Sequence, residues 1–196
     1  MPTRKPTIIL ASSSPYRREL LSRIGIAAQC HAPDIDETPF DNEAPAALAA
    51  RLAIAKAQHI ARHHSNALII GSDQVAELDG QPLGKPGSRA RAIAQLQACS
   101  GKTLVFHSGL CLINSNNQRQ QHCVERFAAS FRTLSQQQIQ RYVDREPALD
   151  CAGSFKMEGL GISLFRSLNG RDPNSLIGLP LIRLIDFLEA ENYPIP

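Results

Sequence analysis

The chain contains the pentapeptide Ile69-Ile70-Gly71-Ser72-Asp73, in which an apolar strand runs directly into an acid. The run from Leu68 to Ile70 is rich in β-branched residues of the buried type, and Gly71-Ser72 is expected to end it at the edge of a sheet. α/β proteins build ligand sites at strand ends, where a carboxylate on rigid backbone can hold a metal ion or activate a water molecule. For Gly-Ser-Asp alone, a turn-capping role of Asp73 is the commoner one. The rest of the chain favours the site.

Strand and helix patterns alternate at both ends of the chain, and a hairpin pattern lies in the middle. Helices are expected from Ser14-Pro15 to Gly25, from Pro45 to about His63, over Ser88–Cys99, from Ser135 to about Arg145 and over Leu179–Glu189. Strands are expected over Thr7–Ala11, Ala27–Cys30, Leu68–Leu78 with an interruption at Gly71, Thr103–Ile113, Gln120–Phe131 and Ile162–Leu168. Turns are expected at Asp79-Gly80, Asn114–Asn117 and Asn169-Gly170, and the glycine-rich segment Asp150–Gly161 is expected to be irregular. This order predicts an α/β fold with a mixed sheet.

Length and composition indicate a globular protein with one large domain or two small lobes. The 196 residues are 43% hydrophobic and 20% charged, with a net charge of +3. That charge is too small to indicate a nucleic-acid surface, although it suits an anionic small molecule if the basic residues converge. No stretch is long enough for a membrane span, and the apolar run after Met1–Thr7 is too short for a signal peptide. Neither a nucleic acid nor a membrane is therefore expected as a partner.

The five cysteines are widely spaced and show no metal-ligand pattern, and neither do the six histidines. Reduced thiols in a cytoplasmic protein are the better explanation. Cys151 lies in a motif-rich segment, where a packing role is commoner than a functional thiol. A zinc site is not expected.

Four segments concentrate polar groups that packing does not need. Residues 11–18 (ASSSPYRR) join a strand to a helix N-terminus, and their hydroxyls and guanidinium groups are about as consistent with an anion cradle as with a capped helix. The loop 33–39 (PDIDETP) carries three acids that can ligate a hard cation, although a solvated loop is commoner. Lys56 lies on the apolar stripe of its helix, as a snorkelling or a phosphate-binding lysine would. Lys85 lies in a tight Gly-Lys-Pro turn.

Together these segments indicate a polyphosphate held by basic groups beside a carboxylate-bound metal. Neither a P-loop nor a dinucleotide-binding motif is present. With these residues in view, the chain resembles the Maf-like nucleoside triphosphate pyrophosphatases. The matching segments, in the family's order from Leu10 to Leu181, are LASSSPYRRELL, PDIDET, RLAIAKA, IIGSDQV, GKP, CAGSFKMEGLGI and NSLIGLPL.

The resemblance implies one Maf-like domain over residues 1–196, with an elongated mixed sheet flanked by helices and two lobes around a nucleotide-binding cleft. It implies hydrolysis of a nucleoside triphosphate to the monophosphate and pyrophosphate with a divalent cation, Mg²⁺ or Mn²⁺. By the same resemblance, Asp73 corresponds to the proton acceptor, Ser12, Arg17, Lys56 and Lys85 to phosphate-binding positions, and Glu37 with Asp73 to metal-binding positions. A homodimer is compatible with the sequence.

Three positions of the family relate to the base, namely Tyr16, Gln74 and Glu158. The segments SPYRR, GSDQ and KMEG resemble the branch that acts on 7-methyl-GTP. Glu158 also has two acceptor oxygens that suit the N1–H and N2–H donors of guanine, and Tyr16 has a face for a cationic ring. The alternatives are a core tyrosine and a solvated glutamate, a dTTP/UTP pyrophosphatase of the same family, and a non-catalytic nucleotide-binding regulator of septum formation.

Overall fold

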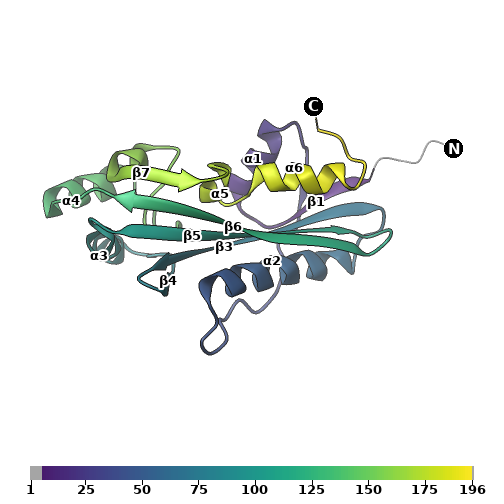
Figure 1. Cartoon of the computed structure of the whole chain (residues 1–196), viewed down its shortest axis with the longest axis horizontal. Helices are drawn as coiled ribbons and strands as arrows, with labels where there is room; N and C mark the ends of the chain where they lie inside the picture. Colours follow the sequence, from purple (N-terminus) through teal and green to yellow (C-terminus); the bar gives the residue numbers. More distant parts are fainter. Residues whose placement is uncertain (1–5, 196) are drawn as a thin grey trace.

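One long mixed β-sheet runs through the molecule (Figure 1), in a computed structural model that describes residues 6–195. Met1–Lys5, the start of the segment considered as a signal peptide, and Pro196 lie outside the described residues. The seven strands are β1 (Thr7–Ala11), β2 (Gln29–Cys30), β3 (Ala67–Leu78), β4 (Gln81–Leu83), β5 (Thr103–Asn114), β6 (Arg119–Phe131) and β7 (Phe165–Gly170). Their order is β2-β1-β3-β5-β6-β7, and β4 pairs with β3. Strand β1 is parallel to β2 and β3, whereas the pairings of β3 with β4 and β5, of β5 with β6 and of β6 with β7 are antiparallel. The predicted mixed α/β fold is confirmed.

Helices cover both faces of the sheet. They are α1 (Pro15–Arg23), α2 (Pro45–Ala61), α3 (Arg89–Cys99), α4 (Gln136–Arg145), α5 (Asn174–Ile177), α6 (Leu181–Glu189) and the 3₁₀ turn η1 (Leu160–Leu164). Ser14 and Ser135 cap their helices as predicted, and Ser88 caps α3 in the same way: each hydroxyl accepts a bond from the backbone N–H three residues further on. None of the helices in the described range is long and apolar enough to cross a membrane.

Two predictions about strands were wrong. Strand β3 does not end at Gly71 but continues to Leu78, so Asp73 lies in the middle of a strand and not at its tip. The strand expected over Ile162–Leu168 begins only at Phe165, because residues 160–164 form a 3₁₀ turn, and it continues through the predicted turn at Asn169-Gly170. The turn at Asp79-Gly80 was correct, and both residues have positive φ, as a tight hairpin requires.

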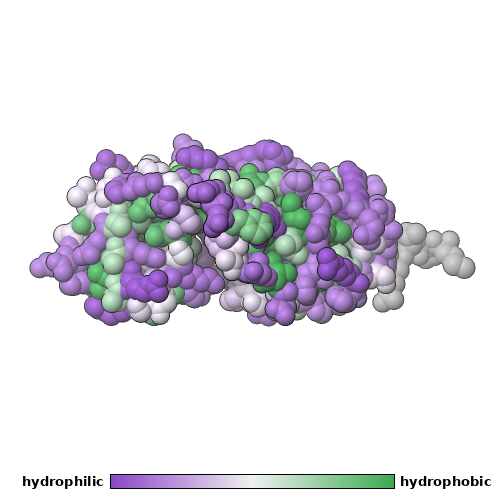
Figure 2. Space-filling view, turned by 90° about the horizontal axis from the view of Figure 1, so that it is seen from below, coloured by the Kyte–Doolittle hydropathy of each residue, from purple (hydrophilic) through white to green (hydrophobic). Residues whose placement is uncertain are grey.

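The core is divided along the length of the sheet. Near β1, one face packs against α1 and α6, and the other face packs against α2 through small residues of that helix. Towards β7, a second large cluster lies on the face of the sheet that packs against α1 and α6, and there it includes residues of α3, α4 and the segment around Phe155. Figure 1 shows α2 below the sheet, with α1, α5 and α6 above it. Hydrophilic residues cover most of the face shown in Figure 2, with apolar residues scattered among them.

Helix α2 lies unusually close to the sheet because two strand residues facing it are glycines. A Cβ at Gly71 would overlap the carbonyl oxygen of Ala53 and lie 2.8 Å from the Cβ of Ala57. A Cβ at Gly109 on the adjacent strand would overlap the carbonyl oxygen of Ala49. Gly71 is therefore the place where α2 crosses the sheet, and the crossing sets how near the side chains of α2 come to β3.

One edge of β3 changes partner along its length. It pairs with β1 as far as Gly71 and with β4 from Ala76 onward. Among the described strands, none pairs with residues 72–75 on that side. This unpaired stretch lies where β1 ends at Ala11 and the chain turns into α1, so the expectation of a site at the end of a strand applies to β1 and not to β3.

Candidate active site

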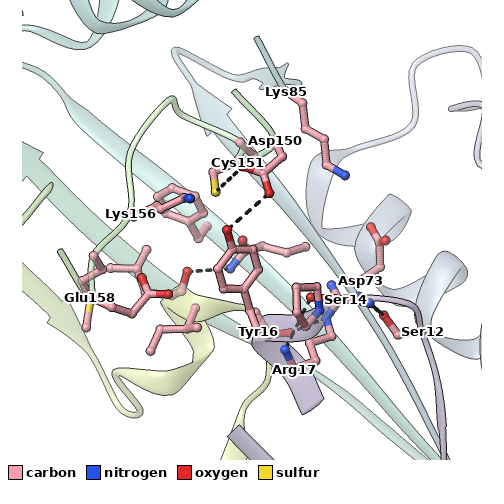
Figure 3. Close-up of a pocket in the computed structure, with 18 of the residues that line it drawn as sticks. Ser12, Ser14, Tyr16, Arg17, Asp73, Lys85, Asp150, Cys151, Lys156 and Glu158 are labelled. Carbon is pink, nitrogen blue, oxygen red and sulfur yellow. Dashed lines mark hydrogen bonds between the residues drawn. The ribbon is translucent and has the colours of Figure 1, made fainter. Parts of the chain in front are cut away.

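A pocket of about 440 Å³ opens over the unpaired stretch of β3. Its walls come from the β1–α1 connection, from β3 and α2, from residues 150–158 and from the backbone after α5 (Figure 3). All nine site residues predicted from the sequence line it: Ser12, Tyr16, Arg17, Glu37, Lys56, Asp73, Gln74, Lys85 and Glu158. We call the part around Asp73, with Ser12, Arg17, Glu37, Lys56 and Lys85, the basic end, and the part around Tyr16, Asp150, Lys156 and Glu158 the acidic end.

Lys56 is the centre of the basic end. Its ammonium donates to Asp73 Oδ1 at 2.6 Å and lies 2.7 Å from Glu37 Oε1. Lys56 is 6% exposed and Asp73 8% exposed, so the ion pair between them is largely withdrawn from water. The position of Lys56 on the apolar stripe therefore reflects a buried ion pair and not a snorkelling side chain.

Arg17 forms the second wall of the basic end. Its Nε donates to the carbonyl of Gly178 at 2.9 Å, and its Nη1 donates to Ser12 Oγ at 3.3 Å. Burial lowers the pKa of Arg17, while the negative charges of Asp73 and Glu37 act in the opposite direction. Arg17 therefore lines the pocket, whereas Arg18 is exposed and is not among the lining residues.

The segment 174–181 (NSLIGLPL) supports this wall through a backbone carbonyl. The Gly178 carbonyl accepts a bond from Ser72 Oγ at 3.0 Å as well as from Arg17, which ties α1 to β3. On the other side of the pocket in Figure 3, Lys85 extends from the loop after β4. Three cations and two carboxylates thus surround one hollow, although they come from five separate segments.

The acidic end is built around the ring of Tyr16. The Tyr16 hydroxyl donates to Asp150 Oδ2 at 3.3 Å, and the ammonium of Lys156 lies 5.7 Å from the ring centroid. Burial raises the pKa of Tyr16, and the hydrogen bond with Tyr16 raises the pKa of Lys156, so the phenol stays neutral and the ammonium charged. Glu158 is exposed at the far end of the pocket (Figure 3).

Gln74 lines the pocket but its amide nitrogen is engaged by the protein. It donates to the carbonyls of Ser175 at 2.7 Å and Leu176 at 3.1 Å. These bonds fix α5 against the sheet. The side chain thereby leaves its carbonyl oxygen as the group that can face a ligand.

Neither Asp150 nor Lys156 was predicted as a site residue. Asp150 directly precedes the segment CAGSFKMEG and Lys156 lies within it, but only Glu158 and the thiol of Cys151 were considered there. Burial raises the pKa of Cys151 to about 11, and its thiol lies 3.6 Å from Asp150 Oδ1. Cys151 is thus a neutral wall residue rather than a nucleophile.

The carboxylates of the basic end fit a hard divalent cation. Asp73 and Glu37 both reach one ammonium, so their oxygens converge on a single cationic position. Mg²⁺ is typically bound by one or two carboxylates together with phosphate oxygens and water. No group of three or more His, Cys, Asp or Glu side chains placed to hold a metal occurs within residues 6–195.

Comparison with known proteins gives a consistent result over nearly the whole chain. Residues 7–191 match the model of the family described as Maf-like protein. The chain is 54% identical to the 7-methyl-GTP pyrophosphatase of Alcanivorax borkumensis over 100% of both chains. It is 54% identical to that of Nitrosococcus oceani, over 97% of this chain and 96% of the relative, and 52% identical to that of Pseudomonas aeruginosa, over 97% and 100%. The chain therefore belongs to the family of Maf-like proteins.

Proposed function

We propose that this protein is a nucleoside triphosphate pyrophosphatase that hydrolyses 7-methyl-GTP to the monophosphate and pyrophosphate with a divalent cation. The observation that carries the proposal is the charge arrangement of the pocket. The basic end has three cations against two carboxylates, and the acidic end has two carboxylates against one ammonium. A pocket polarised in this way suits a ligand with an anionic chain at one end and a cationic ring at the other.

The basic end has the groups that the reaction needs. A water molecule attacks the α-phosphorus, the bond from that phosphorus to the bridging oxygen breaks, and pyrophosphate leaves. Asp73 accepts the proton of the attacking water. Arg17, Lys56 and Lys85 neutralise the charge that develops on the leaving pyrophosphate. Asp73 and Glu37 would hold a divalent cation, which would supply further charge neutralisation.

The acidic end favours guanine over thymine and uracil. Glu158 accepts from the adjacent N1–H and N2–H donors of guanine, whereas pyrimidines of the dTTP/UTP type present carbonyl oxygens that a carboxylate repels. A cationic ring gains from the face of Tyr16 as well. The free cysteines of the described chain suit a reducing compartment, and we place the enzyme in the cytoplasm as a housecleaning activity of the nucleotide pool.

The test is pyrophosphate release from 7-methyl-GTP, GTP, dTTP and UTP, with and without added Mg²⁺ or Mn²⁺. Metal-dependent release with the highest kcat/KM for 7-methyl-GTP is expected, together with loss of activity in Asp73→Asn. Preference for dTTP or UTP would instead establish the alternative substrate. Nucleotide binding without turnover in wild type would identify a regulator rather than an enzyme.

A further inference from the structure

Guanine and 7-methylguanine share most of the groups that a pocket can recognise. The N1–H and N2–H donors are common to both, so Glu158 favours each of them over a pyrimidine without telling one from the other. Methylation at N7 adds a positive charge to the ring. A residue that selects the methylated base must therefore act on charge near the imidazole side of the purine.

The arrangement of the pocket identifies where that side lies. With the triphosphate at the basic end and the N1–N2 edge at Glu158, the imidazole part of the purine lies between them. Figure 3 shows Tyr16 and Asp150 in this intermediate position, with Lys156 and Glu158 farther from the basic end. Asp150 is the acid nearest to the ring on which the base would stack, since the Tyr16 hydroxyl donates to it at 3.3 Å.

The net charge of the acidic end indicates which residue selects the methylated base. Lys156 is a full ammonium and offsets one carboxylate. With Glu158 alone, the acidic end would have no net charge, and only the face of Tyr16 would favour a cationic base. Asp150 adds the negative charge that makes this end complementary to one positive charge. We propose that Asp150 is the residue by which the protein discriminates 7-methylguanine from guanine, an inference that rests on the proposed function.

Asp150 has a second role to be separated from this one, because its bond to the Tyr16 hydroxyl also orients the ring. Asp150→Asn keeps an oxygen that accepts this bond and removes only the charge. Tyr16→Phe removes the bond and keeps both the ring face and the charge. The two variants therefore separate recognition of charge from positioning of the ring.

The experiment measures kcat/KM for 7-methyl-GTP and for GTP with wild type and each variant, at low ionic strength and at a slightly acidic pH at which the methylated base keeps its N1 proton. A charge pair at about 4 Å that is screened as in bulk water corresponds to a change of about 5-fold. Asp150→Asn should therefore lower the ratio of 7-methyl-GTP to GTP activity by about that factor. Lys156→Met should raise the same ratio, because it removes a like charge near the base. Glu158→Gln should lower both activities and leave the ratio within about 2-fold.

An unchanged ratio in Asp150→Asn would overturn the inference while leaving the pyrophosphatase itself intact. An equal fall of the ratio in Tyr16→Phe would show that Asp150 acts only by orienting the ring, which also overturns it. Failure of wild type to release pyrophosphate from 7-methyl-GTP would instead refute the proposed function. Because Asp150 is exposed, thermal unfolding of Asp150→Asn should match wild type and serves as the folding control.

Discussion

Replacing Lys56 by Met is expected to cost much more stability than replacing Asp73 by Asn, although the two residues form one ion pair. Lys56 contacts two acids, with Asp73 at 2.6 Å and Glu37 at 2.7 Å. Without the ammonium, the carboxylates of Asp73 and Glu37 lose their shared ion-pair partner, and the charge of Arg17, which offsets them in part, is more distant. With Asn at position 73, Lys56 keeps Glu37 as its counter-ion, and the amide oxygen still accepts a bond from the ammonium. The shared cation makes the pair asymmetric.

The exposures of the three side chains set the magnitude. Removing one partner of a buried ion pair costs about 3–5 kcal/mol, and the lower value applies because 12% of the Asp73 side chain remains exposed. Asp73→Asn exchanges a charged acceptor for a neutral one, at about 1 kcal/mol. Glu37→Gln alone should cost less than about 1 kcal/mol, because 56% of its side chain is exposed. The double variant Glu37→Gln/Asp73→Asn should cost about 2–3 kcal/mol, more than the sum of its parts, since Lys56 is then buried without any counter-ion.

Urea unfolding at neutral pH measures these differences. With a slope of about 2 kcal/mol/M, the midpoint should fall by about 1.5 M in Lys56→Met and by about 0.5 M in Asp73→Asn. Pyrophosphate release should be lost in both variants, so stability and activity separate them. Equal losses of stability in the two single variants, or strict additivity in the double variant, would refute the view that Lys56 is shared between two acids.

Three further predictions follow from the packing and from the thiols. Gly71→Ala should lower the free energy of unfolding, measured in urea titrations, by about 1–3 kcal/mol, because the added Cβ would overlap the α2 backbone. Gly84→Ala is the control: no atom lies within 4 Å of its added Cβ, so the free energy of unfolding should change by less than about 1 kcal/mol. Alkylation at neutral pH, followed by mass spectrometry, should label the exposed Cys30 first. Cys151, whose pKa burial raises to about 11, should react slowly, and more slowly still when a nucleotide is bound. Fast labelling of Cys151 that a nucleotide does not slow would contradict its place in the pocket wall. Burial raises the pKa of Cys111 to about 12, so this thiol stays protonated in the folded state, whereas in the unfolded chain it ionises near about pH 8.5. The stability of the wild type should therefore fall as the pH rises through about 9 to 12. Thermal unfolding across this pH range should show a shallower fall in Cys111→Ala than in the wild type.

Local patterns were sufficient to predict most of the elements. The caps at Ser14, Ser88 and Ser135 and the hairpin at Asp79-Gly80 depend on side chains within three residues of each other, so short stretches of sequence contain the whole signal. Gly71 was misinterpreted for the opposite reason. A glycine is required at position 71 because α2, from another part of the chain, crosses the strand there. The sequence around Gly71 alone does not distinguish this requirement from the end of a strand.

The site was predictable to the extent that single residues stood out from their surroundings. Lys56 interrupts an apolar stripe, and Asp73 follows the apolar run 68–70, so each was recognisable by itself. Asp150 and Lys156 lie in an irregular loop where polar residues are ordinary. Their significance arises from Tyr16, which is 134 residues from Asp150 in sequence and bonded to it in the structure. Such a pairing is a property of the fold.

The unpaired stretch of β3 explains why one pocket can gather groups from both faces of a sheet. Consecutive strand residues point to opposite faces, so Asp73 and Gln74 would ordinarily line different surfaces. Asp73 meets Lys56 of α2 on one face, and Gln74 meets the carbonyls of α5 on the other. Both nevertheless line the same pocket, because between β1 and β4 the edge of β3 has no strand partner within the described chain. A strand segment paired with residues 72–75 would fill this gap and close the pocket, so the break in strand pairing is as necessary to the proposed chemistry as the acid itself.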